Sequence, residues 1–351
     1  MIGRTNKHRS APVLFAALAL ASACGDAQPS AGSPASRPLT DATAPVGFPA
    51  GPVTRAAPAD SPLTEARAQL GRRLFFDKNL SRTGLVACAS CHKPELAFAD
   101  KVAVSPGVDG RLGNRNAPSL ANLAWNDRFF LDGRAASLEE QAGMPIENPV
   151  EMDLPRAEAV ARLAADDSYV QAFAGAFGQP PSDLTMRQAL ASFVRTLVSG
   201  DSPYDRHLRG DDSSFPAEAQ RGETVFFGER GGCFHCHAPG ALTNDGFFNN
   251  GSYTDGGDPG REGVTGLPGD LGKFKVPGLR NVAVTAPYMH DGSLLTLDAV
   301  CWQYVQAGRD HTNIDPQIRQ LDLCDEDVYD LVAFLNALTD DAFLNDSRYR
   351  P

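Results

Sequence analysis

The sequence predicts an all-α fold built from two related domains, with long loops and little or no β structure. The pattern Gly-x-x-apolar-Phe-Phe occurs at residues 71–76 and again at residues 222–227, which indicates an internal repeat. Several segments carry apolar residues at helical spacing, whereas no convincing run alternates apolar and polar residues as a half-buried strand does. The length of 351 residues also suits about two domains of ~150 residues each.

The composition excludes one class of function and makes the cysteines the most informative residues. The 32 basic and 43 acidic side chains give a net charge of −11, whereas nucleic-acid-binding proteins present a basic face. The 33 glycines and 26 prolines are many for a compact enzyme, which fits helices joined by long loops. Seven cysteines are too few for a disulfide scaffold, so their positions matter more than their number.

The N-terminus has the features of an export signal over residues 1–24. A basic segment precedes an apolar run at residues 11–23, and small residues precede Cys24. The apolar run is shorter than the ~20 residues that span a bilayer. Lipidation of Cys24 would anchor the mature chain to a membrane, and plain cleavage near Ala23 is the alternative. The basic residues of this signal are Arg4, Lys7 and Arg9.

Residues 25–61 are predicted to form a flexible tether. They are rich in Pro, Ala, Ser and Gly and show no periodicity. Removal of the signal takes three basic side chains away and changes the net charge from −11 to −14. We therefore expect an acidic body in the periplasm or cell envelope, with a lipid on Cys24 as its one link to a membrane.

Two C-x-x-C-H motifs predict two covalently attached c-type haems. In this motif two thiols bond the two vinyl groups of one haem, and the adjacent histidine reaches the iron. A zinc knuckle or a redox dithiol is the alternative. Zinc needs four neighbouring ligands, but the motifs are 145 residues apart (residues 88 to 233), and a redox dithiol has no need of the following histidine. The motif residues are Cys88, Cys91 and His92, and Cys233, Cys236 and His237.

Helix signals surround both motifs. Each Gly-x-x-apolar-Phe-Phe segment precedes its motif, so in each half a helix should pack phenylalanines near a haem. Capping boxes at residues 137–140 and 185–188 predict two helix starts. Asp325 begins another apolar-periodic helix, and the Gly- and Asp-rich stretch 200–215 is the predicted domain boundary. The apolar faces of the second and third helices are Ala189, Leu190, Phe193 and Leu197, and Val328, Leu331, Phe334, Leu335 and Leu338.

Longer motifs around the haem sites resemble the bacterial di-haem cytochrome c peroxidase family, whose superfamily includes the MauG-type enzymes. The resemblance covers roughly residues 62–340 and implies two cytochrome c-like haem domains in tandem. Residues 62–205 would form the peroxidatic domain and residues 216–345 the electron-transfer domain. The motifs are residues 115–120 (RNAPSL), 131–135 (LDGRA), 138–142 (LEEQA), 145–152 (PIENPVEM), 274–277 (FKVP), 279–281 (LRN) and 285–292 (TAPYMHDG).

The resemblance implies a peroxide site at the first haem. His92 would be the ligand below the iron, and Glu151, Gln141 and Pro145 would lie on the opposite, distal side. A carboxylate in a dry pocket can take a proton from H2O2 and return it to the leaving oxygen. From the sequence alone, a glutamate after a proline is more often a solvated loop charge, and the resemblance favours the catalytic role. Many family members block this iron with a histidine at the position of Val108, so we expect an open distal side here.

At the second haem the resemblance implies His237 as one ligand and Tyr304 as the other. Many family members use methionine at that position, whereas MauG-type enzymes use tyrosine. Tyr304 is otherwise an aromatic on the core face of a helix, and Met289 is the rival ligand. The family usually has a tryptophan between the haems, immediately before Asp-Gly-Arg, but this chain has Leu131. Whether Trp125 or Trp302 substitutes is left open.

Three further assignments complete the prediction, and the same resemblance implies the first of them. Asn116, Thr285 and Pro287 match the residues that bind a calcium ion, which prefers oxygen ligands, although Asn116 also suits a turn. Cys301 and Cys324 remain as a plausible disulfide or as two buried thiols. Candidates to pair with haem propionates, with surface solvation as the alternative, are Arg115, Lys275 and Arg280.

The leading functional hypothesis is an exported peroxidase that reduces H2O2 with electrons from a small c-type cytochrome or copper protein. The second is a MauG-type enzyme that oxidises residues of a partner protein. Tyr304 and Val108 favour it, and Leu131 weakens it. The third is a plain di-haem electron carrier, which would have no use for Glu151 and Gln141.

Overall fold

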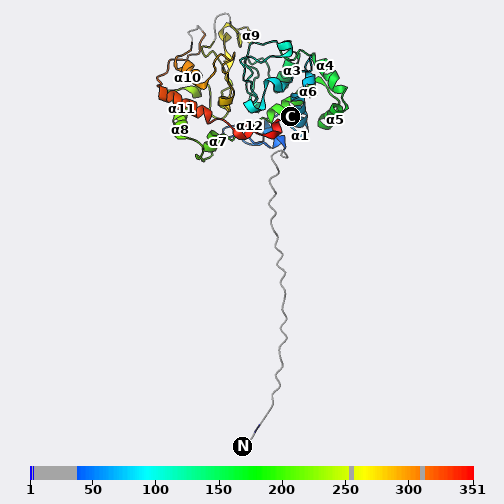
Figure 1. The fold of residues 1–351 in the computed structure, drawn as a ribbon, viewed down its shortest axis with the longest axis horizontal. Coiled ribbons are helices and arrows are strands. Elements are labelled where there is room, and N and C mark those ends of the chain that lie inside the picture. The colour runs from blue at the N-terminus through cyan, green and yellow to red at the C-terminus, as the bar shows by residue number, and fades with distance from the viewer. Residues whose placement is uncertain (2, 4–37, 253–256, 309–312) are drawn as a thin grey trace.

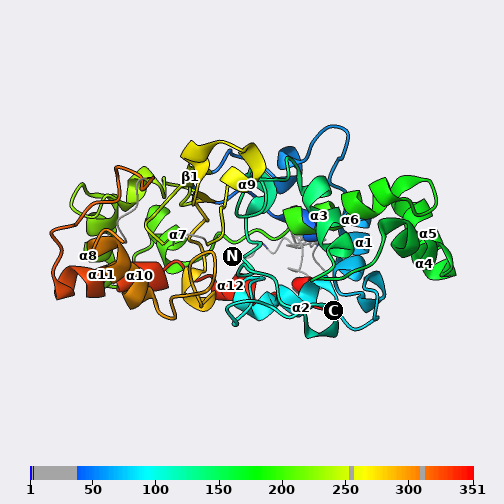
Figure 2. The same ribbon diagram turned by 90° about the horizontal axis from the view of Figure 1, so that it is seen from above.

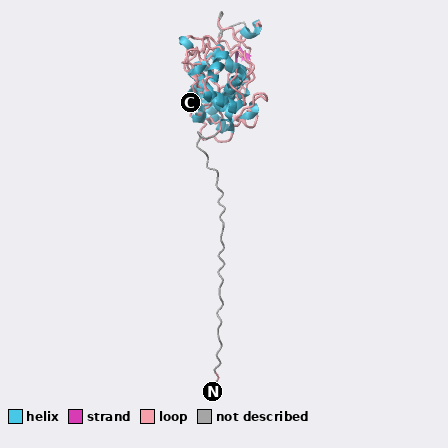
Figure 3. Cartoon of the chain, turned by 90° about the vertical axis from the view of Figure 1, so that its right-hand side faces the viewer, coloured by secondary structure: helices cyan, strands magenta, loops and turns pink. Residues whose placement is uncertain are grey.

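The computed structural model describes residues 1, 3, 38–252, 257–308 and 313–351. Helices and loops make up nearly all of this part, and the two short strands pair antiparallel (Figure 3). The strands are β1 (Phe247–Phe248) and β2 (Phe274–Lys275). The helices are α1 (Glu65–Phe75), α2 (Cys88–Cys91), α3 (Leu138–Glu147), α4 (Arg156–Ala164), α5 (Asp167–Phe177), α6 (Asp183–Arg195), α7 (Pro203–Leu208), α8 (Ala217–Phe227), α9 (Glu262–Thr265), α10 (Leu297–Val305), α11 (Asp325–Asn336) and α12 (Asp341–Leu344). The predicted helix-rich class is confirmed.

Side-chain caps fix several helix starts, and one predicted start was wrong. The Ser137 hydroxyl accepts from the Glu140 amide at 3.1 Å, so the predicted start of α3 is confirmed, but the Glu140 carboxylate accepts from the Ala136 amide and the box is only half formed. The second box was placed at Thr185, but α6 begins at Asp183 with Ser182 as its cap. Ser182 and Thr185 cap one another there, because each accepts from the other's backbone amide. The α11 start at Asp325 is confirmed.

The body contains two hydrophobic clusters, each built around a pair of packed helices. In the first cluster α1 packs against α6, and in the second α8 packs against α11. Figures 1 and 2 show α8, α10 and α11 at one end of the molecule and α4 and α5 at the other. The predicted Phe-Phe segments end α1 and α8, and Phe75 and Phe226 are buried in the two clusters.

A glycine brings the helices of each pair into backbone contact. A Cβ added at Gly71 would lie 1.9 Å from the Ala189 carbonyl oxygen and 2.9 Å from the Phe193 Cβ. A Cβ at Gly222 would lie 1.9 Å from the Asp330 carbonyl oxygen and 2.9 Å from the Phe334 Cβ. The two halves therefore use the same helix contact, and the repeated glycine is required by close approach.

Replacing either glycine by alanine should destabilise its half of the protein. The methyl group would meet a helical carbonyl that cannot rotate away, so we expect a loss of at least about 1–3 kcal/mol. The matched control is Gly175→Ala in α5, where a Cβ would meet nothing within 4 Å. This change should be neutral or stabilising by about 0.5–1 kcal/mol. Guanidinium unfolding of the three variants measures the difference, and equal midpoints would contradict the close-contact argument.

A buried polar junction joins the halves and extends the repeat. Asn122 and Asn281 both adopt left-handed backbone (φ 61° and 63°), and each is almost completely buried. The Asn122 amide donates to Leu197 O at 2.8 Å, and the Asn281 amide donates to Leu338 O at 2.9 Å. The Asn281 side-chain amide also donates to the Ser199 hydroxyl at 2.9 Å. The two equivalent asparagines thus bind the same segment, residues 197–199: Asn122 bonds Leu197 and Asn281 bonds Ser199.

The boundaries differ from those predicted. Residues 38–61 do not behave as a tether, because Leu39 and Val53 are buried in the first cluster. The C-terminal residues Phe343 and Tyr349 also belong to the first cluster, although they follow the second half in sequence. The expected boundary 200–215 contains α7 and contributes buried residues to the second cluster. The export signal apart from residues 1 and 3, Cys24 and residues 25–37 lie outside the described residues.

Within the part of the chain that the structure describes, no helix combines the length and the apolar character needed to cross a membrane.

Candidate functional site

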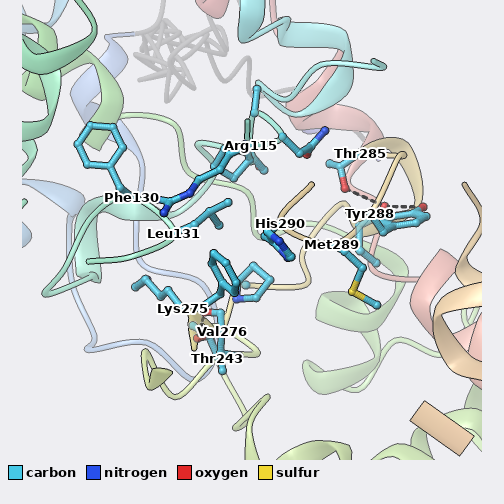
Figure 4. A pocket seen from close by; sticks show the side chains of 18 of the residues that line it. Arg115, Phe130, Leu131, Thr243, Lys275, Val276, Thr285, Tyr288, Met289 and His290 are labelled. Carbon is cyan, nitrogen blue, oxygen red and sulfur yellow. Dashed lines mark hydrogen bonds between the residues drawn. The ribbon is translucent and has the colours of Figure 1, made fainter. Parts of the chain in front are cut away.

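One large cavity lies between the two halves and has a volume of about 830 Å³. Figure 4 shows Arg115, Phe130 and Leu131 of the first half across the cavity from Lys275, Val276 and His290 of the second. All candidate site residues predicted from the sequence line this cavity. They are Cys88, Cys91, His92, Arg115, Asn116, Gln141, Pro145, Glu151, Cys233, Cys236, His237, Lys275, Arg280, Thr285, Pro287 and Tyr304.

The first C-x-x-C-H motif forms a single helical turn on the cavity wall. Cys88 and Cys91 begin and end α2, and His92 is its C-terminal cap. The His92 Nδ1 lies 2.7 Å from the Phe98 carbonyl oxygen, so Nδ1 carries the hydrogen and Nε2 is available as a ligand. Burial lowers the pKa of His92, which favours the neutral imidazole that binds metals.

The second motif repeats this arrangement. A short 3-10 turn, Cys233–His235, holds the cysteines, and the His237 Nδ1 lies 2.8 Å from the Leu242 carbonyl oxygen. Burial also lowers the pKa of His237. A carbonyl that accepts from Nδ1 is the usual support of a metal-binding histidine, because it fixes the tautomer and the ring orientation.

Both motifs fit a covalently bound c-type haem. Each presents two cysteines that are not in disulfides, and each histidine is oriented by a backbone carbonyl. Burial raises the pKa of Cys88 and Cys233 to about 12, so these thiols are protonated before any bond forms. Among the described residues no group of three or more His, Cys, Asp or Glu side chains could hold a metal ion by itself.

Glu151 lies in the loop after α3 and is half-buried on the wall beside the first motif. Asn148 Nδ2 donates to the Glu151 Oε1 at 2.6 Å and so orients the carboxylate. Burial raises the pKa of Glu151, and the Asn148 hydrogen bond and the charge of Arg134 offset part of that rise. The surroundings therefore favour a carboxyl group that can both take up and release a proton.

Val108 shows how the chain shapes this side of the cavity. It is fully buried, and its amide donates to the Glu151 carbonyl oxygen at 2.8 Å. Gly107 touches the same backbone, since a Cβ there would lie 2.5 Å from the Glu151 carbonyl oxygen. Val108 is not among the residues that line the cavity. The described histidines that do line it are His92, His237 and His290.

The repeat places Pro145 and Tyr304 at equivalent positions. Ser137 caps α3 and Thr296 caps α10, and each residue of the pair lies eight positions after its cap (137 to 145 and 296 to 304). Both line the cavity. The proline side chain has no atom that can bind iron, whereas the tyrosine side chain has a hydroxyl oxygen that can. The two halves therefore present different chemistry from the same position of one repeated helix.

Two side chains near the second motif carry possible iron-binding atoms. Asn250 Nδ2 donates to the Tyr304 hydroxyl oxygen at 3.0 Å and lies 3.6 Å from the Met289 sulfur. Burial raises the pKa of Tyr304 to about 12. The structure thus brings both sequence-predicted rivals to one amide.

The three predicted propionate-binding cations already have carboxylate partners. Arg280 is 4% exposed and pairs with the fully buried Asp205, so surface solvation is wrong for it. Lys275 is 9% exposed and pairs with Asp245. Arg115 joins the two halves, because it binds Asp132 of the first half and both oxygens of Asp258 of the second.

The calcium candidates lie where the halves meet. The Asn116 amide donates to the His290 carbonyl oxygen at 2.8 Å, and its side-chain nitrogen donates to the carbonyl oxygens of Val102 and Ala103. Thr285 and Pro287 line the same cavity.

The predicted disulfide between Cys301 and Cys324 is absent from the structure, which has both as free thiols. Cys301 is buried in the second cluster within α10, whereas Cys324 is exposed as the cap of α11. The Cys324 sulfur lies 3.2 Å from the Asp327 carboxylate. Helix packing therefore fixes the two cysteines in different environments.

Neither of the two tryptophans lines the cavity wall to which Leu131 belongs. Trp125 and Trp302 are not among the described residues that line the cavity. Trp125 packs instead on Phe48, with ring centroids 4.6 Å apart. The Leu131 carbonyl oxygen accepts from the Lys275 amide at 2.7 Å, which directly connects the two halves.

Two functional candidates were missed. Arg134 lines the cavity, lies 3.5 Å above the Phe130 ring and bonds Asp132 at 2.9 Å. His290 stacks on Phe274 with a centroid distance of 4.0 Å. Both belong to a repeated turn that the sequence signals only weakly. Its two copies run from Phe129 to Ala135 and from Tyr288 to Leu294, with Gly133 and Gly292 at φ 70° and 69°.

Comparison with known proteins gives a consistent family. The di-haem cytochrome c peroxidase family model matches residues 65–213. The methylamine utilization protein MauG of Methylorubrum extorquens is 40% identical over 277 residues, which cover 78% of each chain. The cytochrome c551 peroxidase of Pseudomonas aeruginosa is 37% identical over 283 residues, covering 77% of this chain and 78% of the other.

Solved structures agree with this result. A MauG-like protein associated with microbial copper homeostasis has a TM-score of 0.79 and 37% identity, covering 84% of this chain and 95% of that one. The di-haem peroxidase BthA of Burkholderia thailandensis has a TM-score of 0.72 and 25% identity, covering 87% and 96%. The family model, the relatives and the shared fold together show that the chain belongs to the di-haem cytochrome c peroxidase family.

Proposed function

We propose that the chain reduces H2O2 to water at the half that carries His92. The observation that carries this proposal is the position of Glu151: a half-buried carboxylate with a raised pKa on the cavity wall that also holds Gln141 and the first haem motif. When bound, the two haems supply the redox chemistry, in which two electrons break the O–O bond. The balance is H2O2 + 2 e⁻ + 2 H⁺ → 2 H2O.

In this proposal Glu151 moves the proton. Its ionised carboxylate takes a proton from one peroxide oxygen and returns it to the other oxygen, which leaves as water. The Asn148 amide keeps the carboxylate oriented through its 2.6 Å hydrogen bond. Gln141 orients the peroxide by hydrogen bonding, and Pro145 keeps that side free of a competing ligand.

The second half would bring in electrons, with His237 and Tyr304 as its iron ligands. Tyr304 occupies the place that Pro145 has in the first half, which supports a division between a peroxidatic half and an electron-transfer half. A hard phenolate stabilises oxidised iron, whereas a thioether favours reduced iron. A small c-type cytochrome or copper protein is the proposed donor. The acidic body would attract a basic donor at low salt.

Three finer assignments remain part of the proposal. Export to the periplasm or cell envelope, with a lipid on Cys24, is supported by the N-terminal sequence pattern. A calcium ion bound by Asn116, Thr285 and Pro287 is supported by their position at the seam between the halves. Arg115, Lys275 and Arg280 all line the cavity, and Arg115 and Lys275 are the better candidates to meet haem propionates, because Arg280 is enclosed by Asp205 and Gly240.

A spectrum of the purified ferric protein tests the proposal. A mixture of high-spin and low-spin haem is expected, since Pro145 leaves one iron with an open position. Two low-spin haems in both redox states would contradict it and would indicate an electron carrier. Rapid peroxide turnover with reduced cytochrome c is the expected activity.

A second candidate function is oxidation of residues on a partner protein, as in the MauG-type alternative. Tyr304 on the cavity wall and the buried Val108 favour it, and the 40% identity to a MauG protein is consistent with it. Leu131 weighs against it, as does the fact that Trp125 and Trp302 do not line the cavity. Slow turnover with reduced cytochrome c, together with oxidation of a partner, would select this function.

Tyr304→Phe is expected to remove the second ligand of the low-spin haem. The phenyl ring keeps the packing of α10 but has no oxygen to bind iron. Electron paramagnetic resonance of the ferric protein should show loss or replacement of the low-spin signal. Tyr288→Phe is the matched control, since this nearby hydroxyl donates to the Val282 carbonyl oxygen. An unchanged signal in Tyr304→Phe would refute ligation.

A further inference from the structure

The second half of the cavity contains one amide that touches both candidate ligands. Asn250 Nδ2 lies 3.0 Å from the Tyr304 oxygen and 3.6 Å from the Met289 sulfur. A side-chain amide nitrogen carries two hydrogens, so it can serve both atoms at once. All three residues line the cavity.

The orientation of this amide is fixed by its other end. The Asn250 Oδ1 accepts from the Ser252 backbone amide at 3.1 Å. A backbone N–H can only donate, so the atom facing Ser252 must be the oxygen. The nitrogen therefore faces Tyr304 and Met289, and the Tyr304 oxygen is necessarily an acceptor there.

The loop that carries Asn250 is held against α10. Gln303, the residue before Tyr304, donates through Nε2 to the Gly251 carbonyl oxygen at 3.4 Å. Gly308 also packs closely, since a Cβ there would lie 2.9 Å from the Asn250 carbonyl oxygen. Asn250 is thus positioned by the same helix that carries Tyr304.

Met289, the second contact of this nitrogen, has an unusual backbone conformation. Its φ is 71°, a left-handed value that is unfavourable for an L-residue with a side chain. The repeated turn imposes this value, because Phe130 at the equivalent place has φ 64°. The turn therefore fixes the backbone of Met289 beside Asn250, whereas its flexible side chain can still exchange partners.

We propose that Asn250 is a positioning residue that selects Tyr304 rather than Met289 as the second iron ligand. One N–H fixes the phenolic oxygen as an acceptor and leaves its remaining valence for the iron. The other N–H holds the thioether, a weak acceptor, away from it. This inference rests on the proposed pairing of His237 with Tyr304 and adds the residue that sets the choice.

Loss of the amide donors should change the ligand. Asn250→Asp keeps the size of the side chain and the oxygen that faces Ser252 but removes both N–H groups. Asn250→Leu removes them without adding charge. In both haem-loaded variants we expect the tyrosine-type low-spin signal to be replaced by a thioether-type signal, with a higher midpoint potential of the second haem. Adding Met289→Leu to either variant should abolish the new signal.

Two parallel measurements make the test decisive. Gln303→Leu loosens the same loop but leaves the Asn250 amide intact, so its low-spin signal and potential should match the wild type. The same change in Gln303→Leu as in Asn250→Asp would overturn the proposal. Wild-type signals in both Asn250 variants would also overturn the proposal, provided that Tyr304→Phe alters the spectrum. If Tyr304→Phe itself changes nothing, the ligand assignment under the proposed function fails instead.

Discussion

Replacing Glu151 by glutamine should slow the reaction with H2O2 by about 10²–10⁴-fold, the usual contribution of a positioned proton-transfer group. Glutamine has nearly the same shape and can still accept from Asn148, but it cannot take up a proton. The measurement is stopped-flow mixing of the fully oxidised protein with H2O2. Glu158→Gln is the matched control, because it removes the same charge from an exposed position on α4.

The pH dependence provides a second readout of the same residue. Burial raises the pKa of Glu151 above its ordinary 4.5, so the reactive carboxylate forms only as pH rises through this higher value. The peroxide rate should therefore increase with pH across that range in the wild type and stay flat in Glu151→Gln. Asn148→Ala removes a hydrogen bond to the carboxylate and should move the midpoint to higher pH. A wild-type profile in Glu151→Gln would refute the proton-transfer role.

The stability of Glu151→Gln separates lost chemistry from lost folding. A raised pKa means that the folded protein binds this proton more tightly than the unfolded chain does. Stability therefore decreases as pH rises from the unfolded pKa through the folded one, because the buried carboxylate must ionise. Glu151→Gln has no such loss, so at neutral pH it should be at least as stable as the wild type.

The haem sites could be predicted because their chemistry depends on short sequence spacings. A C-x-x-C-H motif places two thiols and an imidazole on one helical turn wherever it folds, and both motifs line the cavity. Glu151 and Tyr304 were found through longer motifs, and the repeat gives Tyr304 the position in its half that Pro145 has in the other.

Features that depend on distant packing could not be predicted. Composition suggested a tether over residues 25–61, but a few apolar residues such as Leu39 and Val53 suffice to dock its second part on the core. The compartment made a disulfide plausible, but only the fold shows that Cys301 and Cys324 occupy different environments. The partner of Arg280 is 75 residues away, and no local pattern indicates it.

That partner changes what removal of Arg280 should do. Arg280 is enclosed by the fully buried Asp205 on α7, and its guanidinium also donates to the Gly240 carbonyl oxygen at 3.0 Å. Gly240 follows His237 by three residues, so Arg280 holds both α7 and the turn after the second motif. Asp205 in addition accepts from the Ser202 amide and hydroxyl at the start of α7.

Arg280→Met should therefore cost about 3–5 kcal/mol of folding free energy, because Asp205 would be left as a buried charge without its partner. The double variant Asp205→Asn/Arg280→Met keeps an acceptor for Ser202 and removes that charge, so it should recover part of the loss. Arg230→Met is the control: its side chain is 61% exposed, so solvent screens its pair with Asp327 and the loss should be small. Guanidinium unfolding followed by circular dichroism compares the three. A loss in Arg280→Met no larger than in the control would show that Arg280 has no structural role in the pair and would return it to the propionate-binding candidates.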